Sequence, residues 1–239
     1  PGDIEVDDDA RGIGNPPGKL RVIRSDDLAA LVSEVDLSQP LGSPEDMEAH
    51  KEILDASAEG TPVLPLRFGA VLESKEQVTE ELLKAHHDEF ASALSELEGK
   101  AQYVVRGRYP EEAVLAEMLA ENPDIAEMAE QIRGKDPDAT RDVRIQLGEA
   151  INNAISAKRE QDSRAAADAM ADVAVASVTN EPTHERDAVH MAFLVEADKQ
   201  DEVQRVVDDL AEKWEGRVEL RLLGPMAAYD FVGTTAGQG

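Results

Sequence analysis

The chain has 239 residues, 41% of them hydrophobic but only 3% aromatic, which is enough for one large or two ordinary domains with largely aliphatic cores. Its 51 acidic and 24 basic residues give a net charge of -27, and so negative a surface repels nucleic-acid backbones and anionic lipids. The chain contains no cysteine, which excludes disulfides and thiolate chemistry, and no apolar run approaches the roughly 18 residues of a membrane span.

The amino-terminal part combines an acidic start with a stretch rich in glycine and proline up to residue 18, a composition that predicts a mobile loop. It has neither an initial methionine nor the pattern of a signal peptide, so we expect the natural protein to begin upstream and to remain in the reducing cytoplasm. Residues 20–23 alternate as in a short strand. Residues 28–35 favour a second strand, although Ala29 and Ala30 also suit a helix.

A loop over residues 36–42 leads to a predicted helix that begins at Ser43 and ends near Ala58. The Ser43 hydroxyl can accept a hydrogen bond from a free backbone N–H, and Pro44 suits the first helical position. The two acidic residues that follow face the positive end of the helix dipole, which also favours a helix start here.

The next segment, residues 62–72, is apolar except for Arg67. Its two prolines remove two backbone donors, which predicts a strand near a sheet edge or one that starts with a bulge. Such a strand would point Arg67 away from Leu66 and Phe68, and a buried guanidinium needs an acidic partner. We therefore expect an ion pair between Arg67 and a carboxylate of a neighbouring helix, and the alternative is a contact with a partner protein.

The spacing of apolar residues predicts one helix over residues 74–97. Ser74 and Gln77 have the spacing of a capping box, and Gly99 suits a left-handed stop at the end of the helix. Residues 101–106 form the next predicted strand. The first half of the chain is therefore predicted to interleave strands and helices over one sheet.

The middle of the chain is predicted to be helical. Residues 109–134 have a helical pattern that the Asn-Pro pair at 122–123 divides in two, and the Asp-Pro pair at 136–137 opens a further helix. Residues 158–178 contain no Pro or Gly and are rich in Ala, so they fit either one long helix or a pair of helices. The predicted buried stripe of the helix after residue 137 consists of Val143, Leu147, Ala150, Ile151, Ala154 and Ile155.

The carboxy-terminal part returns to strands. A loop is predicted over residues 180–187, and residues 188–197 are apolar on both faces, as in a central strand. Asp198 caps a predicted helix that ends at Gly216. Residues 217–222 alternate strictly, which indicates a strand with one solvated face.

The recurrence of strand, helix and strand in both halves predicts an α+β fold with two domains. We expect an N-terminal α+β domain over residues 1–108 and a C-terminal α+β domain with a long helical segment over residues 109–232. Residues 233–239 are predicted to be a flexible tail. The C-terminal domain best fits a ferredoxin-like arrangement, with the helical segment between the domains or within the second.

Candidate metal or catalytic residues are few. His86 and His87 are adjacent, so on a helix their side chains diverge by about 100° and do not readily share a metal. His86 and Glu89 have the spacing of a ligand pair, but no third ligand is evident. We therefore expect His86 to line the apolar stripe between Leu82 and Phe90, and we expect no metal, cofactor or catalytic residue.

The hexapeptide Leu-Pro-Leu-Arg-Phe-Gly at residues 64–69 closely resembles a segment of the gas vesicle protein GvpF/GvpL family. Its surroundings have the same order as in that family, with His50 in the preceding helix and Tyr103 in the strand after the second helix. His50 is expected to be a hydrogen-bonded core residue. Near the end of the chain, the segment 224–231 resembles the Gly-Pro and aromatic ending of the family, so the resemblance covers residues 20–232.

Two departures from the family pattern are visible. Met226, Ala227 and Ala228 stand where relatives often have more proline or a larger aromatic residue, which affects what can be carried over to the carboxy-terminal segment. The tyrosine-rich first strand of the family is absent, which agrees with the expectation that the natural chain begins upstream.

The resemblance implies an accessory protein of gas vesicles that binds the small hydrophobic shell protein GvpA, and possible further accessory proteins, during vesicle nucleation and assembly. It implies a place at the gas vesicle or in the cytoplasm and no enzymatic activity. An acidic carrier with an apolar groove, beside residues 62–72 or between the domains, would cover the shell protein, and its charge would keep the complex dispersed. The predicted contact residues are Arg67, Phe68, Gly69, Tyr229 and Phe231.

Three alternatives remain open from the sequence. The chain could be a minor structural component that stays in the vesicle wall. It could also be an enzyme for a small substrate, which the absence of a catalytic motif makes the least favoured class. Tyr229 and Phe231 could close the core instead of anchoring a partner, and these two interpretations are equally favoured.

Overall fold

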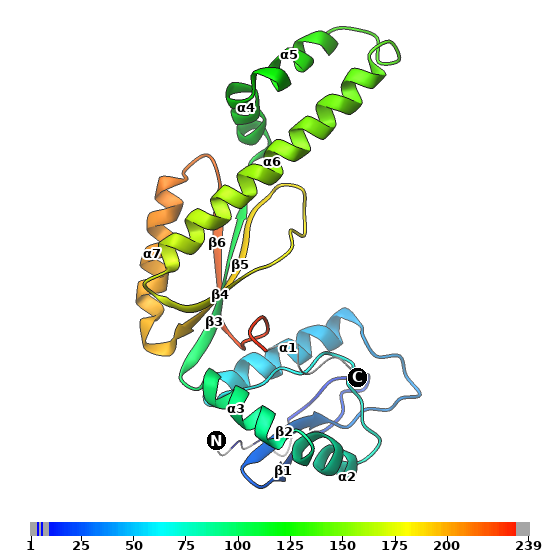
Figure 1. The fold of residues 1–239 in the computed structure, drawn as a ribbon. Helices are drawn as coiled ribbons and strands as arrows, with labels where there is room; N and C mark the ends of the chain where they lie inside the picture. Colours follow the sequence, from blue (N-terminus) through cyan, green and yellow to red (C-terminus); the bar gives the residue numbers. More distant parts are fainter. Residues whose placement is uncertain (1–3, 5, 7–9, 233–239) are drawn as a thin grey trace. The chain divides into compact units, whose positions relative to one another are not determined.

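The protein, shown in Figure 1 as a computed structural model, is described at residue 4, residue 6 and residues 10–232. These residues form a mixed α/β structure, and the chain divides into two compact units. Unit 1 consists of Pro1–Gln102 together with Gly224–Gly239, and unit 2 consists of Tyr103–Leu223. The predicted tail over residues 233–239 lies outside the described residues.

Unit 1 begins with a two-stranded antiparallel sheet. Strands β1 (Leu20–Ser25) and β2 (Leu28–Ser33) pair in a register that joins Ser25 to Leu28, which confirms both predicted strands. The connecting turn places Asp26 at a φ of 51°, a left-handed conformation that Asp tolerates better than most residues.

Helix α1 (Pro44–Ala58) follows, and its start confirms the prediction. The Ser43 hydroxyl accepts a hydrogen bond from the Asp46 N–H at 3.1 Å, and the Asp46 carboxylate accepts one from the Ser43 N–H at 3.1 Å. This reciprocal pair is a capping box, which satisfies backbone donors that the first helical turn leaves free.

The segment 62–72 forms no strand, so the prediction of an edge strand there is wrong. Pro62 and Pro65 supply no backbone donors, and the chain turns where the Ala70 N–H donates to the Arg67 carbonyl at 3.2 Å. Gly69 has a φ of 89° within this turn, a conformation that favours glycine. The apolar character of the segment instead serves packing, since Leu64 contacts the core of unit 1.

The predicted single helix over residues 74–97 is also wrong, because three pieces replace it. They are α2 (Lys75–Gln77), a π-helical stretch η1 (Val78–Lys84) and α3 (His87–Leu97). His86 has φ −116° and ψ 22°, which breaks the helix before α3. Ser74 caps the Gln77 N–H at 3.2 Å, but the Gln77 side chain accepts from Glu73, so only half of the predicted capping box forms.

The core of unit 1 explains this interruption. The wider turns of the π-helix allow residues from η1 and α3 to reach the same cluster over the β1–β2 sheet. Gly99 ends α3 with a φ of 68°, which confirms the predicted left-handed stop. The buried residues of the cluster are Leu28, Val78, Leu83 and Phe90, and Ile23, Ala30, Val32, Leu64, Leu82, Ala91 and Leu94 pack against them.

Unit 2 is built on a four-stranded sheet with the strand order β4-β5-β3-β6. The central position of β5 confirms the strand predicted over residues 188–197, and every residue of it except Glu196 is buried or half-buried. The predicted strand over residues 101–106 is confirmed as part of β3. The strand bounds are β3 (Lys100–Arg108), β4 (Ala174–Thr179), β5 (Asp187–Glu196) and β6 (Glu219–Met226).

The helices of unit 2 follow the predicted break and correct two boundaries. Pro123 starts the second of two helices, as predicted, but residues 137–140 form a turn and the long helix begins only at Arg141. Residues 174–178 belong to strand β4, so the helical prediction fails there because β5 supplies their backbone partners. The helices are α4 (Glu111–Glu121), α5 (Pro123–Ile132), α6 (Arg141–Met170) and α7 (Gln200–Lys213), with a 3-10 turn η2 (Ala197–Lys199) before α7.

Helix α6 packs against β5, α5 and α7 within unit 2, as Figure 1 shows. Its most deeply buried residues include Ala166 and Met170, toward the end of the helix, while the predicted stripe of its first half is half-buried apart from Leu147. Among the helices of the described residues, none is long and apolar enough to cross a membrane.

Candidate partner-binding surface

The first part of the predicted site is the irregular segment that carries Arg67 and Phe68. Arg67 is exposed, and within the part of the chain that the structure describes its side chain makes no ion pair. The expected pair with a helix carboxylate is therefore wrong. The cause is the missing strand, since an irregular surface segment leaves the guanidinium in water, where it needs no partner.

Phe68 is half-buried against helix α1. Its ring meets the His50 ring edge to face, with 5.3 Å between the centroids and 81° between the planes. A Cβ atom placed on Gly42 would lie 3.9 Å from the Phe68 ring, so the ring also borders the loop that precedes α1. Burial lowers the pKa of His50, although a backbone hydrogen bond with Leu66 acts against this, so the neutral form of His50 packs on Phe68 near neutral pH.

The loop beside Phe68 is held by the Asp46 carboxylate. Besides its part in the capping box, this carboxylate accepts the Gly14 N–H at 2.8 Å and the Gly42 N–H at 3.0 Å. These backbone hydrogen bonds hold the pKa of Asp46 below its ordinary value. The loop around Gly14 is therefore joined to the start of α1 and to the residue just before it, and the Phe68 contact lies next to this junction.

Two apolar residues follow Arg67 and Phe68 on the same segment. Val71 is 44% exposed and Leu72 is 40% exposed. Single exposed apolar residues are ordinary, but here two of them follow a half-buried aromatic residue and an exposed arginine within six residues of chain. This combination of an apolar patch and an arginine is typical of residues that contribute to protein interfaces.

The second part of the predicted site is the carboxy-terminal segment. Strand β6 continues through Gly224 and Pro225 to Met226. After the strand, Asp55 on α1 accepts the Ala227 N–H at 3.0 Å and the Tyr229 hydroxyl at 3.2 Å. Burial and the nearby Asp55 carboxylate raise the pKa of the Tyr229 phenol, which keeps it a hydrogen-bond donor.

A buried glutamine completes the attachment of this segment. The Gln102 side chain donates to the Asp230 carboxylate at 2.5 Å and accepts the Asp230 N–H at 2.9 Å. Phe231 next to it is half-buried. Tyr229 is thus tied to α1, and the role of Phe231 as a partner anchor stays a prediction.

The structure brings both parts of the predicted site to α1. Phe68 contacts His50, and Tyr229 contacts Asp55, five residues further along the same helix. Five residues correspond to roughly 140° around a helix axis, so the two contacts occupy different sides of α1. Helix α1 is therefore the scaffold of the predicted surface, although the residues do not share one face of it.

The predictions for the adjacent histidines have mixed outcomes. His86 is exposed and stacks on Phe90 at 5.4 Å, so it contacts the expected stripe from its edge. Its Nδ1 lies 3.2 Å from a Glu89 carboxylate oxygen. His87 bridges Asp88 and Asp27, whose hydrogen bonds raise the pKa of His87. No group of three or more potential metal ligands occurs among residues 4, 6 and 10–232.

An ionic network in unit 2 was not predicted. Asp162 on α6 accepts the Tyr109 hydroxyl at 2.6 Å and both terminal nitrogens of Arg217, at 2.8 and 2.7 Å. Hydrogen bonding to Asp162 raises the pKa of Arg217, and burial raises that of the Tyr109 hydroxyl. The partners are 53 and 55 residues apart in the chain, so no local sequence pattern indicates these contacts.

The network continues along α6. One turn before Asp162, the Lys158 ammonium lies 2.6 Å from Glu117 and 2.8 Å from Glu121, which are one turn apart on α4. Burial acts to lower the pKa of Lys158, but the two carboxylates outweigh it and raise the pKa. These contacts fix α4 to α6, so we assign the network a structural role.

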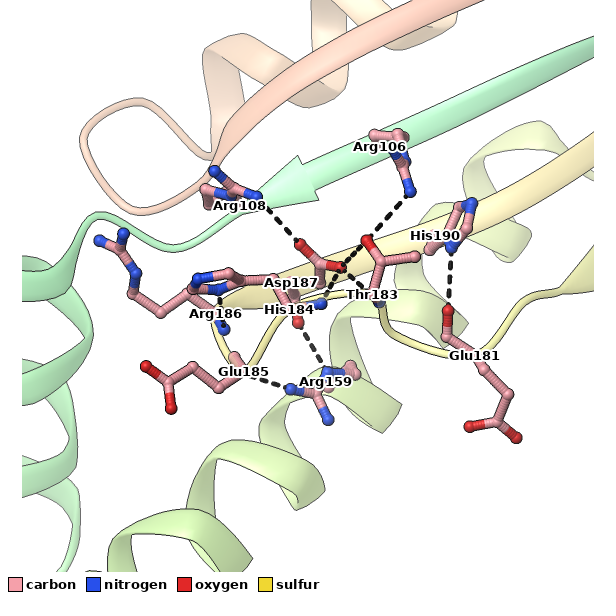
Figure 2. A network of polar contacts seen from close by, with 10 residues as sticks. All are labelled: Arg106, Arg108, Arg159, Glu181, Thr183, His184, Glu185, Arg186, Asp187 and His190. Carbon is pink, nitrogen blue, oxygen red and sulfur yellow. Dashed lines mark hydrogen bonds and ion pairs between the residues drawn. The ribbon is translucent and has the colours of Figure 1, made fainter. Parts of the chain in front are cut away.

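A third polar network, shown in Figure 2, fixes the loop between β4 and β5. The Asp187 carboxylate accepts hydrogen bonds from the Thr183 N–H and hydroxyl and from the His184 N–H, at 2.8 to 2.9 Å. Burial would raise the pKa of Asp187, but these hydrogen bonds and Arg108 hold it below its ordinary value. Arg159 on α6 donates to the carbonyls of Asp187 and Glu185, which joins the loop to the helix.

Comparison with known proteins identifies the family. Residues 3–233 match the family described as gas vesicle synthesis protein GvpL/GvpF, so the chain belongs to this family. Gas vesicle protein F of Streptomyces sp. (strain CB03234) is 30% identical over 228 residues, which cover 92% of this chain and 91% of that protein. Gas vesicle protein F of Dolichospermum flosaquae is 23% identical over 92% of this chain and 89% of that protein.

Two solved structures have the same fold. The crystal structure of GvpF from Anabaena sp. PCC7120 superposes with a TM-score of 0.77 at 21% identity, over 96% of this chain and 94% of that one. That of GvpF from Microcystis aeruginosa gives a TM-score of 0.73 at 18% identity, over 94% and 92% of the two chains. The family membership gives the protein a role related to gas vesicles, and it confirms the resemblance seen in residues 64–69.

Proposed function

We propose that the protein is a gas vesicle assembly factor that binds the hydrophobic shell protein GvpA and keeps it dispersed until it joins the growing wall. The observation that carries this proposal is the free Arg67 guanidinium beside half-buried Phe68 and the exposed Val71 and Leu72. An apolar patch of this kind can cover apolar surface of a partner. Membership in the gas vesicle family makes the shell protein the natural candidate.

The charge of the chain supports a carrier over a wall component. A net charge of -27 makes loaded carriers repel each other, so complexes with an aggregating protein would stay apart. The same charge disfavours the apolar side of a vesicle wall. The action is holding and release, which requires no catalytic group or cofactor, and the place of action is the cytoplasm where vesicles assemble.

We extend the proposal to the domains. The order of elements in unit 2 is β3, helices α4 to α6, β4, β5, α7 and β6, with β3 and β5 in the centre of the sheet. This β-α-β-β-α-β order supports a ferredoxin-like C-terminal domain with its helical segment inserted after the first strand. The N-terminal domain would then carry the binding patch around Arg67.

The test is co-purification of GvpA with the tagged chain. We expect soluble GvpA to elute with the wild-type protein, and Arg67→Gln to retain at least about tenfold less, the equivalent of about 1.4 kcal/mol. Arg141→Gln is the matched control, because Arg141 is also an exposed arginine and stands at the start of α6. If wild-type protein that is folded leaves GvpA in the pellet, direct binding is refuted.

A further inference from the structure

The sheet of unit 2 ends in two edge strands of different chemistry. Strand β4 forms one edge and β6 the other, so each presents a row of backbone N–H and C=O groups that no strand of the sheet pairs. Natural proteins protect such edges with charged side chains, prolines, bulges or covering elements. The two edges can therefore be compared for the protection that each one carries.

Strand β6 carries recognised protection. Glu219 and Arg221 place charges of both signs on the strand, and both side chains are exposed. Pro225 near its end supplies no backbone donor, so another strand cannot pair along the whole edge. This edge resists addition of a further strand, even though Leu223 is 43% exposed.

Strand β4 lacks this protection. Its sequence, Ala-Val-Ala-Ser-Val-Thr, contains no charge and no proline, and four of its six residues are exposed. Val175 is 54% exposed and lies at a break in register, but Ala176 to Thr179 pair regularly with β5. A single bulge at one end leaves four consecutive residues as a regular, uncharged edge.

The network in Figure 2 holds this edge in place. Thr183 of the β4–β5 loop accepts a hydrogen bond from Arg106 on β3, and Asp187 lies 3.7 Å from Arg108 on the same strand. With Arg159 of α6 on the other side, the loop is tied to both a strand and a helix. A strand whose loop is fixed in this way is ordered before a partner arrives, which lowers the entropy cost of binding.

We propose that β4 is a docking edge to which a partner protein adds an extended, apolar and uncharged β-strand. Only a strand matches the spacing of the unpaired backbone groups, and the exposed Val175 and Ala176 offer apolar and small surfaces to its side chains. A second copy of the chain is disfavoured, because two molecules of net charge -27 repel each other. The partner is then a weakly charged, strand-forming protein.

The inference rests on the proposed function for the choice of probe, which is GvpA co-expressed with the tagged full-length chain. The test variant is Val175→Lys/Ser177→Lys, which adds two charges to exposed positions of β4 without emptying the core. The control is Leu223→Lys, an exposed apolar residue of the opposite edge. We expect the β4 variant to retain at least tenfold less GvpA than wild type, and the control to retain the wild-type amount.

Amide hydrogen exchange provides an independent readout. In the wild-type complex we expect at least tenfold slower exchange in a peptide that covers residues 174–179, with no such change in residues 219–226. Equal retention by all variants, or unchanged exchange in β4, overturns the docking edge while leaving the assembly function intact. If the wild-type protein does not retain GvpA, both the assembly function and the docking edge are overturned. If the wild-type protein is a dimer and the β4 variant is a monomer, the edge binds a second copy of the chain and the inference is overturned.

Discussion

Replacing Asp162 with alanine is the sharpest test of how unit 2 is held together. One carboxylate accepts hydrogen bonds from the Tyr109 hydroxyl and from two nitrogens of Arg217. These residues come from the segment after β3, from α6 and from the segment before β6. The substitution therefore removes contacts that join three parts of the unit.

The magnitude follows from what Asp162→Ala leaves behind. The Tyr109 side chain is 0% exposed, so its hydroxyl would lose its acceptor without gaining water, at a cost of about 1–3 kcal/mol. Arg217 would lose its bidentate partner, and breaking a buried ion pair costs about 3–5 kcal/mol. Because the Arg217 side chain is 27% exposed and keeps Glu117 at 4.0 Å, we expect a total near the lower end of this range, about 3 kcal/mol.

The assay is urea unfolding, followed by circular dichroism, with a thermal scan beside it. A loss of about 3 kcal/mol corresponds to a fall in Tm of roughly 6–12 °C for a chain of this size. Tyr109→Phe, which removes one hydrogen bond and leaves the ion pair, should cost only about 1 kcal/mol. The double variant should cost less than the sum of the two, since both substitutions remove the same contact.

The reasoning would be refuted if Asp162→Ala lost less than about 1 kcal/mol, the value of an ordinary hydrogen bond. Strict additivity with Tyr109→Phe would also refute it, because it would mean that the hydroxyl and the carboxylate do not interact in solution. A change in the slope of the urea transition would point instead to altered compactness of one state.

Two further predictions concern paired charges. His87 gains its raised pKa from Asp27 and Asp88, so its contribution to stability is full below its unfolded pKa of about 6.5 and is lost as the pH rises through the folded pKa. Thermal scans across this range should therefore show a loss of stability that His87→Gln lacks, and parallel curves would contradict the pairing. Lys158→Met should cost about 3 kcal/mol in urea unfolding, since it removes the nearer cation of the Glu117 carboxylate, whose other ion pair, with Arg217, is 4.0 Å long. A neutral result would show that the pair is solvated.

Local chemistry explains the predictions that succeeded. The start of α1 depends on Ser43, Pro44 and Asp46, which satisfy one another within four residues, so the sequence suffices to locate it. Gly99 ends α3 for an equally local reason. The central position of β5 was visible because a strand buried on both faces requires an uninterrupted apolar run.

The failed predictions concern segments whose partners lie elsewhere in the chain. The apolar run around Arg67 predicts a strand, but a strand needs a neighbour with free backbone groups, and Leu64 finds a packing partner in the core instead. The prediction of an Arg67 ion pair failed with it. In the same way, the alanine-rich end of residues 158–178 has a sequence typical of a helix, but it forms a strand because β5 supplies backbone partners.

The candidate site was only partly visible in the sequence. The residues 64–69 identified the family and gave Arg67, Phe68 and Gly69 as candidates, but nothing in them indicated that Phe68 would meet His50 on α1. The attachment of Tyr229 to Asp55 joins residues 174 positions apart. Such long-range pairs leave no periodic pattern in the sequence, because a contact between two distant residues does not restrict the residue types next to either of them.

The sequence by itself determined the family, the composition of a negatively charged chain and the elements whose start or end depends on a few adjacent residues. Only the tertiary structure decided that residues 62–72 stay irregular, that a π-helix interrupts residues 74–97, that β4 forms an unprotected edge and that Asp162 joins three parts of unit 2. The physical reason is the distance along the chain between the residues that interact. Caps and turns are satisfied within a few residues, whereas strands, ion pairs and ring contacts take their partners from any part of the chain that folding brings near.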